Sequence, residues 1–404
     1  MTAAELPSSF TELKKLKFLW ITVSNLTGEI PDTIGEMEAL VHLDLSINNL
    51  IGKILSSLFM PKNLSIVYLF RNQLSGEIPR VVEALNIDVI DLSDNKLTGS
   101  LPDDFGRLRN ITGLSLFFNQ LSGEIPDSIG RLPSLMVLKS VHQNLSGTLP
   151  PDFGQLVGVV AFNNHLIGEL PKSLGNCNGL KIVIVYNNRL SGDILSGLWT
   201  SLNLSVLILS DNSFTGELPQ RVATNLSRLE INNDKFFGTS PAGVSSWRNL
   251  VIFKASNNLF IGTIPQELTS LPYLKTLFLD QNRLSDSLPP DIISWKTLNT
   301  LNLHQNKISG LIPQQFGNLA SLTELDLSEN QISGLIPPQL GLLRLTLLNL
   351  SSNLLTGRIP IQFENDAYAN SFLNNLVLCA GKPTLNIRKC DSQVEPLKSS
   401  KHPS

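Results

Sequence analysis

A single pattern recurs along almost the whole chain. Its most regular copy, LTELDLSENQISGLIP, occupies residues 322–337 and follows the form LxxLxLxxNxLxGxIP, where x is any residue. Most copies lie 24 residues apart, and the position of the Asn recurs in fifteen registers: Ser24, Asn48, Asn72, Asn95, Asn119, Gln143, Asn164, Asn188, Asn212, Asp234, Asn258, Asn282, Asn306, Asn330 and Asn353. Such a period indicates structural units that each pack on their neighbours, which predicts a solenoid.

The LxxLxL part of each copy predicts a short strand, because apolar and polar residues alternate there. In one early copy, Leu43 and Leu45 are expected to point inward, and His42, Asp44 and Ser46 outward. Strands of successive copies would then pair in parallel. The Asn amide that follows can both donate and accept, so we expect it to satisfy backbone groups of the turn and of the next repeat.

The LxGxIP part predicts a second, shorter extended stretch, in which Gly permits a positive φ and Pro favours an extended residue before it. A following segment such as QQFGNL (314–319) predicts a short helical or 3₁₀ turn. Two departures stand out: Asp286 replaces the Gly, and the copy between Gln143 and Asn164 is only 21 residues long, which predicts a pinched repeat. The expected fold class is an α/β repeat solenoid with a parallel β-sheet on the concave face and short 3₁₀ or irregular turns behind.

The LxGxIP element is specific to one subclass of repeat. LTGEIP (26–31), LSGEIP (74–79 and 121–126) and ISGLIP (308–313) resemble the plant extracellular leucine-rich repeats. The resemblance covers the chain from residue 6 to about 360 and implies a plant-type leucine-rich repeat superhelix.

The expected organisation has four parts: a partial first repeat (1–15), the repeat array (16–360), a C-terminal cap (361–390) and a disordered tail (391–404). The segment IQFENDAYANSFLNNLVLC resembles the cap of plant receptor ectodomains, and solenoids need such a lid. The first twenty residues lack the basic start and apolar core of a signal peptide and match a repeat entered midway. We therefore expect the natural start of the array to be missing.

Composition excludes several classes of protein. A net charge of −3 gives no footprint for nucleic acid, and 16% charged residues is low. No run of 18 apolar residues is present, so no membrane span is expected in this chain.

No motif for catalysis, metal or cofactor binding accompanies the repeats, and we expect no enzyme activity and no cofactor. The two DFG strings, at residues 104–106 and 152–154, fall where QFG stands at 315–317, without the other kinase motifs. Cys177 takes a leucine position and is expected to be a small buried apolar residue. Cys379 and Cys390 lie in the expected cap and are predicted to form a disulfide, worth about 3 kcal/mol for so short a loop. No CxxC or HxxxH pair suggests a metal site.

Sequons for N-glycosylation are dense, which points to the secretory pathway. The repeat itself readily produces NLS and NLT, so the same strings also arise without any modification. Asn349 lies within an expected strand, where we expect little use of the sequon. The remaining predicted glycosylation sites are Asn25, Asn63, Asn110, Asn144, Asn203 and Asn225.

The repeat leaves the outward strand positions unspecified, so any binding function should lie there. Aromatic and aliphatic residues occupy many of them in the first half, and exposed apolar patches usually mark interaction sites. Acidic residues gather towards the end. The predicted ligand-binding residues are Tyr68, Phe70, Arg71, Asp94, Phe117, Phe118, His142, Phe162, Tyr186, Asp211, Lys254, Phe278, Asp280, His304, Gln305, Glu324 and Asp326.

The chain is most similar to the extracellular part of plant leucine-rich repeat receptor kinases, in particular the HAESA and HAESA-like group. This resemblance implies that a secreted peptide binds along the concave face and that a short leucine-rich repeat co-receptor kinase docks near the C-terminal repeats. It also implies a location on the extracellular face of the plasma membrane, although this chain shows neither a signal peptide nor an anchor and would lack kinase activity of its own.

Two alternatives remain open: a defence protein of the polygalacturonase-inhibitor type, and a receptor-like protein without a kinase. Receptors of the peptide-binding class often carry an R-x-R pair on a late strand for the carboxylate of the peptide. No such pair is present here. His304 and Gln305 lie near the expected place, and Glu324 and Asp326 follow, so a peptide with a basic segment is the alternative to a peptide bound by its free carboxylate.

Overall fold

The structure is a computed structural model that describes residues 4–153, 156–381 and 387–390. It divides into two compact units, Met1–Phe260 (unit 1) and Ile261–Ser404 (unit 2), which are described separately. The predicted tail at 391–404 lies outside the described residues.

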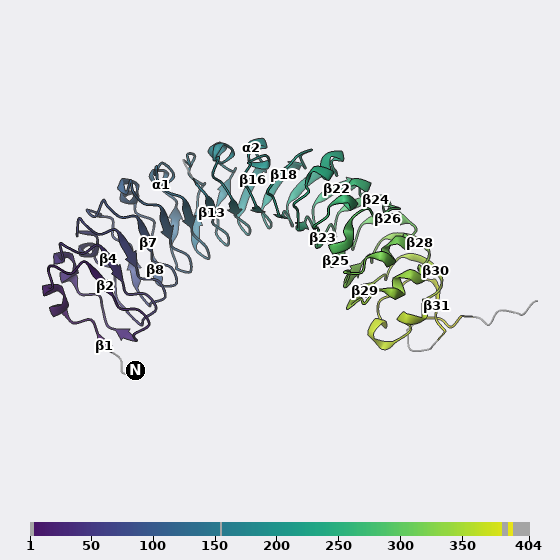
Figure 1. The fold of residues 1–404 in the computed structure, drawn as a ribbon, viewed down its shortest axis with the longest axis horizontal. Coiled ribbons are helices and arrows are strands. Elements are labelled where there is room, and N and C mark those ends of the chain that lie inside the picture. Colours follow the sequence, from purple (N-terminus) through teal and green to yellow (C-terminus); the bar gives the residue numbers. More distant parts are fainter. Residues whose placement is uncertain (1–3, 154–155, 382–386, 391–404) are drawn as a thin grey trace, which may run out of the picture. The chain divides into compact units, whose positions relative to one another are not determined.

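One short strand per repeat builds a parallel sheet in each unit (Figure 1). Each strand pairs in register with the strand of the neighbouring repeat, as Leu43 with Val67 and Leu301 with Leu325. In unit 1 the strands follow the order β2 (Phe18–Trp20), β4 (His42–Asp44), β5 (Ile66–Tyr68), β7 (Val89–Asp91), β9 (Gly113–Ser115), β11 (Val137–Lys139), β13 (Gly158–Val160), β15 (Ile182–Ile184), β17 (Val206–Ile208), β19 (Arg228–Glu230) and β21 (Ile252–Lys254). In unit 2 they are β23 (Thr276–Phe278), β25 (Thr300–Asn302), β27 (Glu324–Asp326) and β29 (Leu347–Asn349).

The LxGxIP elements form a second set of strands, as the sequence predicts. The prediction that this stretch is shorter is wrong, because several of these strands have five residues and the main strands have three. In unit 1 these are β1 (Ala4–Glu5), β3 (Leu26–Thr27), β6 (Ser75–Glu77), β8 (Lys96–Thr98), β10 (Ser122–Glu124), β12 (Asn144–Ser146), β14 (Ile167–Gly168), β16 (Arg189–Asp193), β18 (Ser213–Glu217) and β20 (Lys235–Thr239), with β22 (Leu259–Gly262) at the unit boundary. In unit 2 they are β24 (Arg283–Ser287), β26 (Lys307–Gly310), β28 (Gln331–Leu335) and β30 (Leu354–Arg358), and β31 (Val377–Cys379) adds a strand from the segment after Pro360. The Gly of this element has a positive φ, for example 77° at Gly334, and Asp286 adopts the same conformation with φ 62°.

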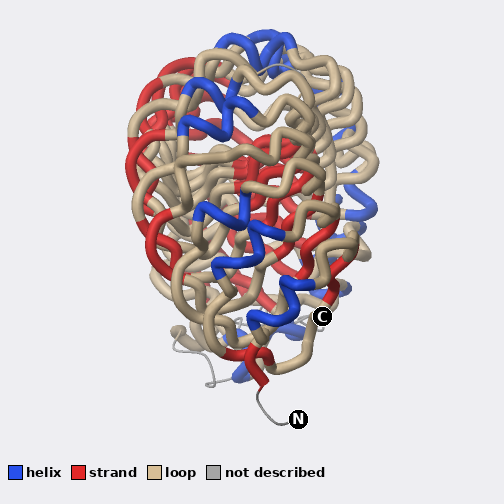
Figure 2. Tube along the Cα trace, turned by 90° about the vertical axis from the view of Figure 1, so that its left-hand side faces the viewer, coloured by secondary structure: helices blue, strands red, loops and turns tan. Residues whose placement is uncertain are grey.

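Short helices follow the second strands, and much of each repeat is loop (Figure 2). The α-helices are α1 (Asp127–Gly130) and α2 (Ser196–Trp199), and both lie on the opposite side of unit 1 from its main sheet (Figure 1). The 3₁₀ helices are η1 (Ser8–Glu12), η2 (Asp32–Glu36), η3 (Ser56–Phe59), η4 (Asp103–Arg107), η5 (Lys172–Asn176), η6 (Ala242–Ser246), η7 (Gln266–Ser270), η8 (Trp295–Thr297), η9 (Gln314–Asn318), η10 (Pro338–Leu342), η11 (Ile361–Phe363) and η12 (Asp366–Tyr368). The first DFG string lies in η4, where Phe105 is fully buried as part of the core.

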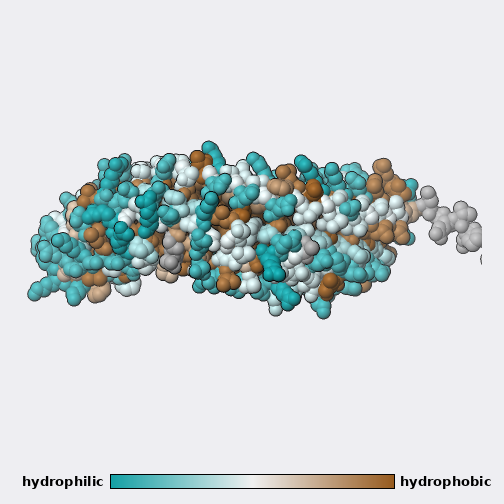
Figure 3. Space-filling view, turned by 90° about the horizontal axis from the view of Figure 1, so that it is seen from above, coloured by the Kyte–Doolittle hydropathy of each residue, from teal (hydrophilic) through white to brown (hydrophobic). Residues whose placement is uncertain are grey.

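The side that carries α1 and α2 shows hydrophilic and hydrophobic residues interspersed rather than one apolar area (Figure 3). The core lies between the two sets of strands, where the leucines of the pattern are buried, as Leu43, Leu45 and Leu50 are. Asp44 and Ser46, expected to point outward, are also buried, and Ser46 donates from its N–H and its hydroxyl to the Asp44 carboxylate. Asp44 pairs with Tyr68 of the neighbouring strand, so its burial does not contradict the expected outward direction.

The Asn residues form a buried ladder along the turns that follow the main strands. Asn48 Oδ1 accepts the N–H groups of Ser24 and Leu26, both at 3.0 Å, and Nδ2 donates to the carbonyls of Ile21 (2.8 Å) and Leu45 (3.0 Å). The prediction that this amide satisfies backbone groups is confirmed. The neighbour that it reaches, however, is the preceding repeat and not the next one.

Two substitutions in the ladder have different consequences. Gln143 reproduces the Asn contacts to the preceding repeat, since Oε1 accepts Leu121 N–H at 2.8 Å and Nε2 donates to the Leu116 carbonyl at 2.6 Å. Asp234 reproduces only half of them. Its Oδ1 accepts Phe214 N–H at 2.9 Å, whereas its buried Oδ2 has no partner among the described atoms. Burial raises the pKa of the Asp234 carboxyl to about 8.

The short repeat after Gln143 keeps its place in the ladder. Asn164 Oδ1 accepts Leu145 N–H at 3.2 Å, and Nδ2 donates to the Ser140 carbonyl at 2.8 Å. The described residues between β12 and β13 contain no helix. The strand register across this short copy is preserved, because Val137, Leu138 and Lys139 of β11 pair with Gly158, Val159 and Val160 of β13.

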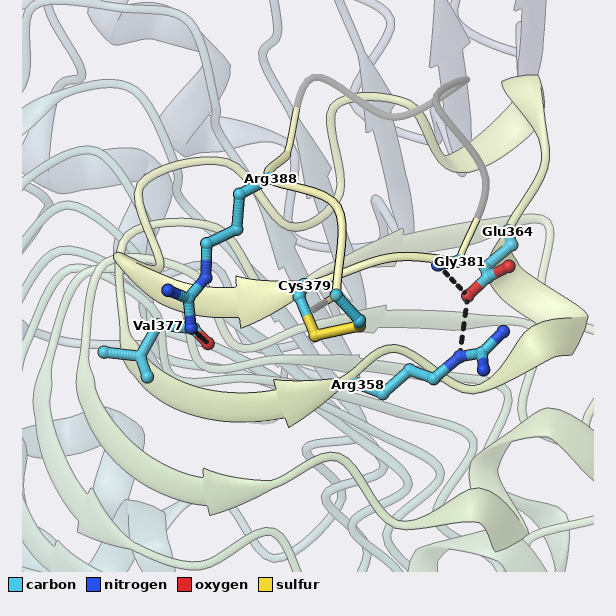
Figure 4. Close-up of a disulfide and its surroundings, with 7 residues drawn as sticks. Arg358, Glu364, Val377, Cys379, Gly381 and Arg388 are labelled. Carbon is cyan, nitrogen blue, oxygen red and sulfur yellow. Dashed lines mark hydrogen bonds and ion pairs between the residues drawn. A yellow bond between two sulfur atoms is a disulfide. The ribbon is translucent and has the colours of Figure 1, made fainter. Parts of the chain in front are cut away.

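The segment after Pro360 closes the last repeat (Figure 4). Strand β31 pairs with β30, and a disulfide joins Cys379 to Cys390. Buried Glu364 accepts from Gly381 N–H at 2.7 Å and pairs with Arg358 at 3.3 Å. Asn375 adds one further rung, because its Oδ1 accepts Leu355 N–H at 3.0 Å and its Nδ2 donates to the Leu350 carbonyl at 2.9 Å.

Candidate functional site: the strand face

The outward side of the main strands, with the three residues after each strand, is called the strand face here. The predicted ligand-binding residues fall on it at recurring positions. Tyr68, Lys254, Phe278 and Asp326 end their strands, and Glu324 begins one. Six residues lie two positions after a strand: Phe70, Phe117, Phe162, Tyr186, Asp280 and His304. Six lie three positions after a strand: Arg71, Asp94, Phe118, His142, Asp211 and Gln305.

The position three residues after each main strand has left-handed backbone in every repeat. Its φ is 54° at Arg71, 53° at Phe118 and 54° at His142, although none of these residues is glycine. This turn directs the next N–H group to the following repeat, as Asn72 N–H donates to the Asp94 carbonyl at 3.1 Å. The buried ladder therefore fixes the direction in which these side chains leave the sheet.

A first ring cluster occupies the strand face at β2, β4 and β5. The His42 ring stacks on Trp20 with centroids 5.6 Å apart, and Tyr68 meets His42 and Phe70 edge to face at 5.7 and 6.1 Å. Trp20 is 68% exposed, and Phe18, also in contact with His42, is 63% exposed. Large exposed rings of this kind are typical of interaction surfaces.

A second ring cluster runs from the end of β9 to the end of β15. Phe118 stacks on His142 at 4.7 Å, and Phe162 stacks on Tyr186 at 4.3 Å, while Phe117 and Phe118 meet edge to face at 5.5 Å. The structure thus brings together five residues that the sequence predicted separately. Burial raises the pKa of the Tyr186 hydroxyl, and the carboxylates of Asp211 and Glu230 raise it further.

A hollow of about 450 Å³ separates the two ring clusters. Tyr68 and Phe70 line one side of it, and Val137 and Lys139 line the other. The remaining lining residues are Val89, Asp91, Gly113, Leu114 and Ser115. The hollow exists because Gly113 and Ser115 carry little or no side chain where other repeats have large ones.

Beyond the second ring cluster, the strand face of unit 1 becomes charged. Arg228 Nε pairs with Glu230 at 2.6 Å, and Lys254 Nζ approaches the other carboxylate oxygen of Glu230 at 3.8 Å. The Glu230 side chain is 11% exposed, so this charge is well buried between two cations. Asp211 follows β17, the strand next to β19, and its side chain accepts a hydrogen bond from Asn233 Nδ2 at 2.6 Å.

The strand face of unit 2 carries a polar network instead of rings. Ser328 Oγ lies 2.8 Å from His304 Nδ1 and donates to Asp326 Oδ1, while Asn349 Nδ2 donates to Ser328 Oγ at 3.0 Å and to Asp326 Oδ2 at 3.2 Å. Ser, His and Asp meet here, but the buried Ser328 hydroxyl contacts both partners at once and His304 is not bonded to Asp326 by any contact described. The arrangement is that of a structural network and not of a nucleophile with its base. Gln305 and Glu324 are exposed at its edge, and Phe278 and Asp280 are half-buried.

The predicted glycosylation sites are accessible. Those at one recurring position of the repeat also donate a hydrogen bond to a backbone carbonyl of the preceding repeat. Asn63 Nδ2 donates to the Glu38 carbonyl at 2.9 Å, and Asn203 and Asn225 make the same bond to Asn178 and Leu202. Asn86 and Asn249, which begin no sequon, make it too. Asn110 and Asn144 are exposed and Asn25 is half-exposed, whereas Asn349 belongs to the polar network. Their glycosylation stays a prediction.

Other classes of site receive no support from the part of the chain described. Cys177 is buried, and its burial raises the pKa of the thiol, so it is a poor nucleophile. Among the described residues, no group of three or more His, Cys, Asp or Glu side chains could hold a metal ion. No described helix is long and apolar enough to span a membrane.

Several residues of the strand face were missed by sequence reasoning. Trp20, His42, Asp91, Gly113 and Lys139 join the ring clusters or line the hollow but were not among the predicted ligand-binding residues. A glycine at a strand position, where other copies carry a side chain, was the available signal for the hollow.

Comparison with known proteins agrees with this architecture. Two family models match: "Leucine rich repeat" over residues 286–332 and 296–355, and "Leucine Rich Repeat" over residues 86–108, 110–132, 203–224 and 273–295. Together with the strand order and the buried ladder, these matches show that the chain is a leucine-rich repeat solenoid and belongs to the leucine-rich repeat proteins.

Among solved structures, the chain is similar to the ectodomain of the Arabidopsis receptor kinase HAESA in complex with the peptide hormone IDA and the co-receptor SERK1. The TM-score is 0.87 at 36% identity, over 95% of this chain and 69% of that one. It is also similar to the ectodomain of GASSHO1/SCHENGEN3 from Arabidopsis thaliana in complex with CASPARIAN STRIP INTEGRITY FACTOR 2, with a TM-score of 0.85 at 30% identity, over 96% of this chain and 53% of that one.

A curated relative is matched over a shorter stretch. "Receptor-like protein 52" of Arabidopsis thaliana is 38% identical over 87 residues, which is 21% of this chain and 11% of that protein. The chain therefore has the repeats and the fold of plant receptor ectodomains.

Proposed function

We propose that this chain is a ligand-recognition ectodomain that binds a secreted plant peptide along its strand face and recruits a short leucine-rich repeat co-receptor kinase. The observation that carries the proposal is the set of exposed and half-buried rings in contact with one another on the strand face of unit 1, because the buried ladder already stabilises the turns on which these rings stand. Such exposed rings supply large contact areas at little conformational cost.

The similarity to HAESA and GASSHO1/SCHENGEN3, both solved with peptides bound, supports the same class of ligand for this chain. The acidic residues of unit 2, Glu324 and Asp326, support a ligand with a basic segment. We also propose the extracellular face of the plasma membrane as the site of action, and the sequon residues as glycan acceptors, in keeping with that location.

The test is calorimetry of the secreted, glycosylated chain against a panel of synthetic plant peptide hormones. A scrambled peptide of the same composition is the control. We expect saturable binding of at least one peptide and its loss in the Phe162→Ala variant. Binding of a polygalacturonase, with no peptide bound, would contradict the proposal and favour a defence inhibitor.

A further inference from the structure

The hollow between the two ring clusters is chemically asymmetric. Tyr68 and Phe70 offer aromatic surface on one side, and Asp91 lies next to them on β7. The floor at Gly113 and Ser115 leaves room for a side chain of the ligand. A volume of about 450 Å³ is ample for one large side chain of a peptide.

The Asp91 carboxylate is held in place without being neutralised. Its Oδ1 accepts the N–H of Ser93 at 3.0 Å and the Ser93 hydroxyl, which fixes the orientation of the carboxylate. No basic side chain among the described residues forms an ion pair with it. A positioned carboxylate without a cation beside an aromatic wall is suited to a cationic ligand group.

Carboxylates outnumber cations around the hollow. Burial raises the pKa of the Tyr68 hydroxyl, and the carboxylates of Asp91, Asp44 and Asp88 raise it further. The opposing cation of the hollow is Lys139, on the far wall. Arg71 is exposed next to Phe70, but it pairs with Asp94 at 3.7 Å.

We infer that the hollow receives an arginine side chain of the peptide, with its guanidinium over the Tyr68 ring and donating to Asp91. A guanidinium suits both partners, because its planar fork matches a carboxylate and its face stacks on aromatic rings. Lys139 lines the far wall and repels a ligand cation there, so the guanidinium is expected on the Asp91 side of the hollow. This inference rests on the proposed function and specifies the ligand chemistry at one place on the strand face.

Gly113 offers a direct test that needs no knowledge of the peptide. A Cβ built at Gly113 would lie 3.6 Å from Val89, an ordinary contact, and Gly113 has no positive φ, so Gly113→Cys should fold. The probes are two disulfides of equal length, one ending in guanidinium and the other in the neutral urea of the same shape. Each exchanges with the new thiol in the presence of 2-mercaptoethanol, and intact-mass spectrometry measures the adduct.

We expect at least tenfold more guanidinium adduct than urea adduct at Gly113→Cys. The preference should disappear when Asp91→Asn is added and persist when Glu324→Gln is added as the matched control. The parent protein corrects for reaction at Cys177 and at the Cys379–Cys390 disulfide. Equal labelling by the two probes, or a preference for the urea probe, would overturn the inference.

The two proposals fail in different ways. If the probes show the guanidinium preference and no peptide of the panel binds, the proposed function fails and the chemistry of the hollow stands. If a peptide binds and the probes show no preference, the receptor function stands and the arginine assignment is wrong.

Discussion

The buried ladder and the strand face begin at the same turns, yet they follow opposite rules. Along the ladder, fifteen registers hold almost the same side chain, and members such as Asn48 and Asn330 bond the backbone of the preceding repeat. One residue earlier, on the strand face, the side chain ranges from Arg71 to Phe118 to Asp211 with the same φ. The comparison shows that the backbone at the strand face is determined from beneath, which leaves its side chains open to variation in function.

The largest expected effect comes from removing a rung of the ladder. Asn330 Nδ2 donates to the carbonyls of Leu303, Leu327 and Ser328, and its Oδ1 accepts Ile308 N–H at 3.0 Å. Asn330→Ala leaves these groups buried without partners, so we expect a loss of about 3 kcal/mol in the free energy of unfolding. Urea denaturation measures the loss, and hydrogen exchange should accelerate at the Ile308 amide. The exposed neighbour change Glu329→Ala is the control, and equal stability of the two variants would contradict the role of the ladder.

Asp234 offers the opposite change, because it is a defective rung that can be repaired. Asp234→Asn restores the missing donor, and we expect a gain of about 2 kcal/mol at pH 8–9. The folded pKa of about 8 lies above the unfolded value, so the folded state binds the proton more tightly. Stability due to this group is present in full below about pH 4 and is lost as the pH rises through 8.

Urea midpoints measured from pH 4 to pH 9 test this sign. The parent protein should lose stability across that range relative to Asp234→Asn, and the difference should be smallest at pH 4. A difference that does not depend on pH would show that the carboxyl is not protonated in the fold.

Asp286 is a second departure from a position that the repeat dictates. It occupies the left-handed conformation that glycine holds at Gly310 and Gly334. Because an L-residue is strained there, Asp286→Gly should stabilise the protein by about 1 kcal/mol. Thermal or urea unfolding measures this gain, with Gly310→Asp as the reverse control. Destabilisation by Asp286→Gly would mean that the side chain makes a contact worth more than the strain.

The smallest effect on stability is expected at the strand face. Tyr186→Ala removes one ring stacked on Phe162 and should cost less than about 1 kcal/mol, because the ring is only half-buried. Phe236→Ala, at a fully buried ring, should cost about 3 kcal/mol. Tyr186→Ala should nevertheless abolish peptide binding in calorimetry, and a variant that binds as well as the parent would remove Tyr186 from the site.

The sequence determined the fold because the repeat pattern records burial directly. The leucines, the ladder residues and the glycines of LxGxIP all take the places that their spacing predicted. The direction in which Asn48 reaches and the burial of Asp44 and Ser46 could not be read from it, since both depend on the adjacent repeat.

The candidate site was predicted as a face but not as an arrangement. Aromatic residues at outward positions of the repeat predicted Phe118, His142 and Phe162. The contacts among these rings depend on side-chain rotamers and on the left-handed turn beneath them. The hollow escaped notice because it consists of small residues, Gly113 and Ser115, which carry no chemistry of their own. The network of His304, Ser328 and Asp326 likewise arises only when neighbouring strands are in register.

The ladder side chains bond towards the preceding repeat, so the array has a direction. This direction affects how the array can evolve. Each rung serves the repeat before it, so a copy duplicated anywhere inside the array brings the side chain that its upstream neighbour needs. Only the final copy depends on a residue that the pattern does not supply, and Asn375 provides it from the cap. Gene duplication can therefore lengthen such a chain while one unchanged cap seals every length.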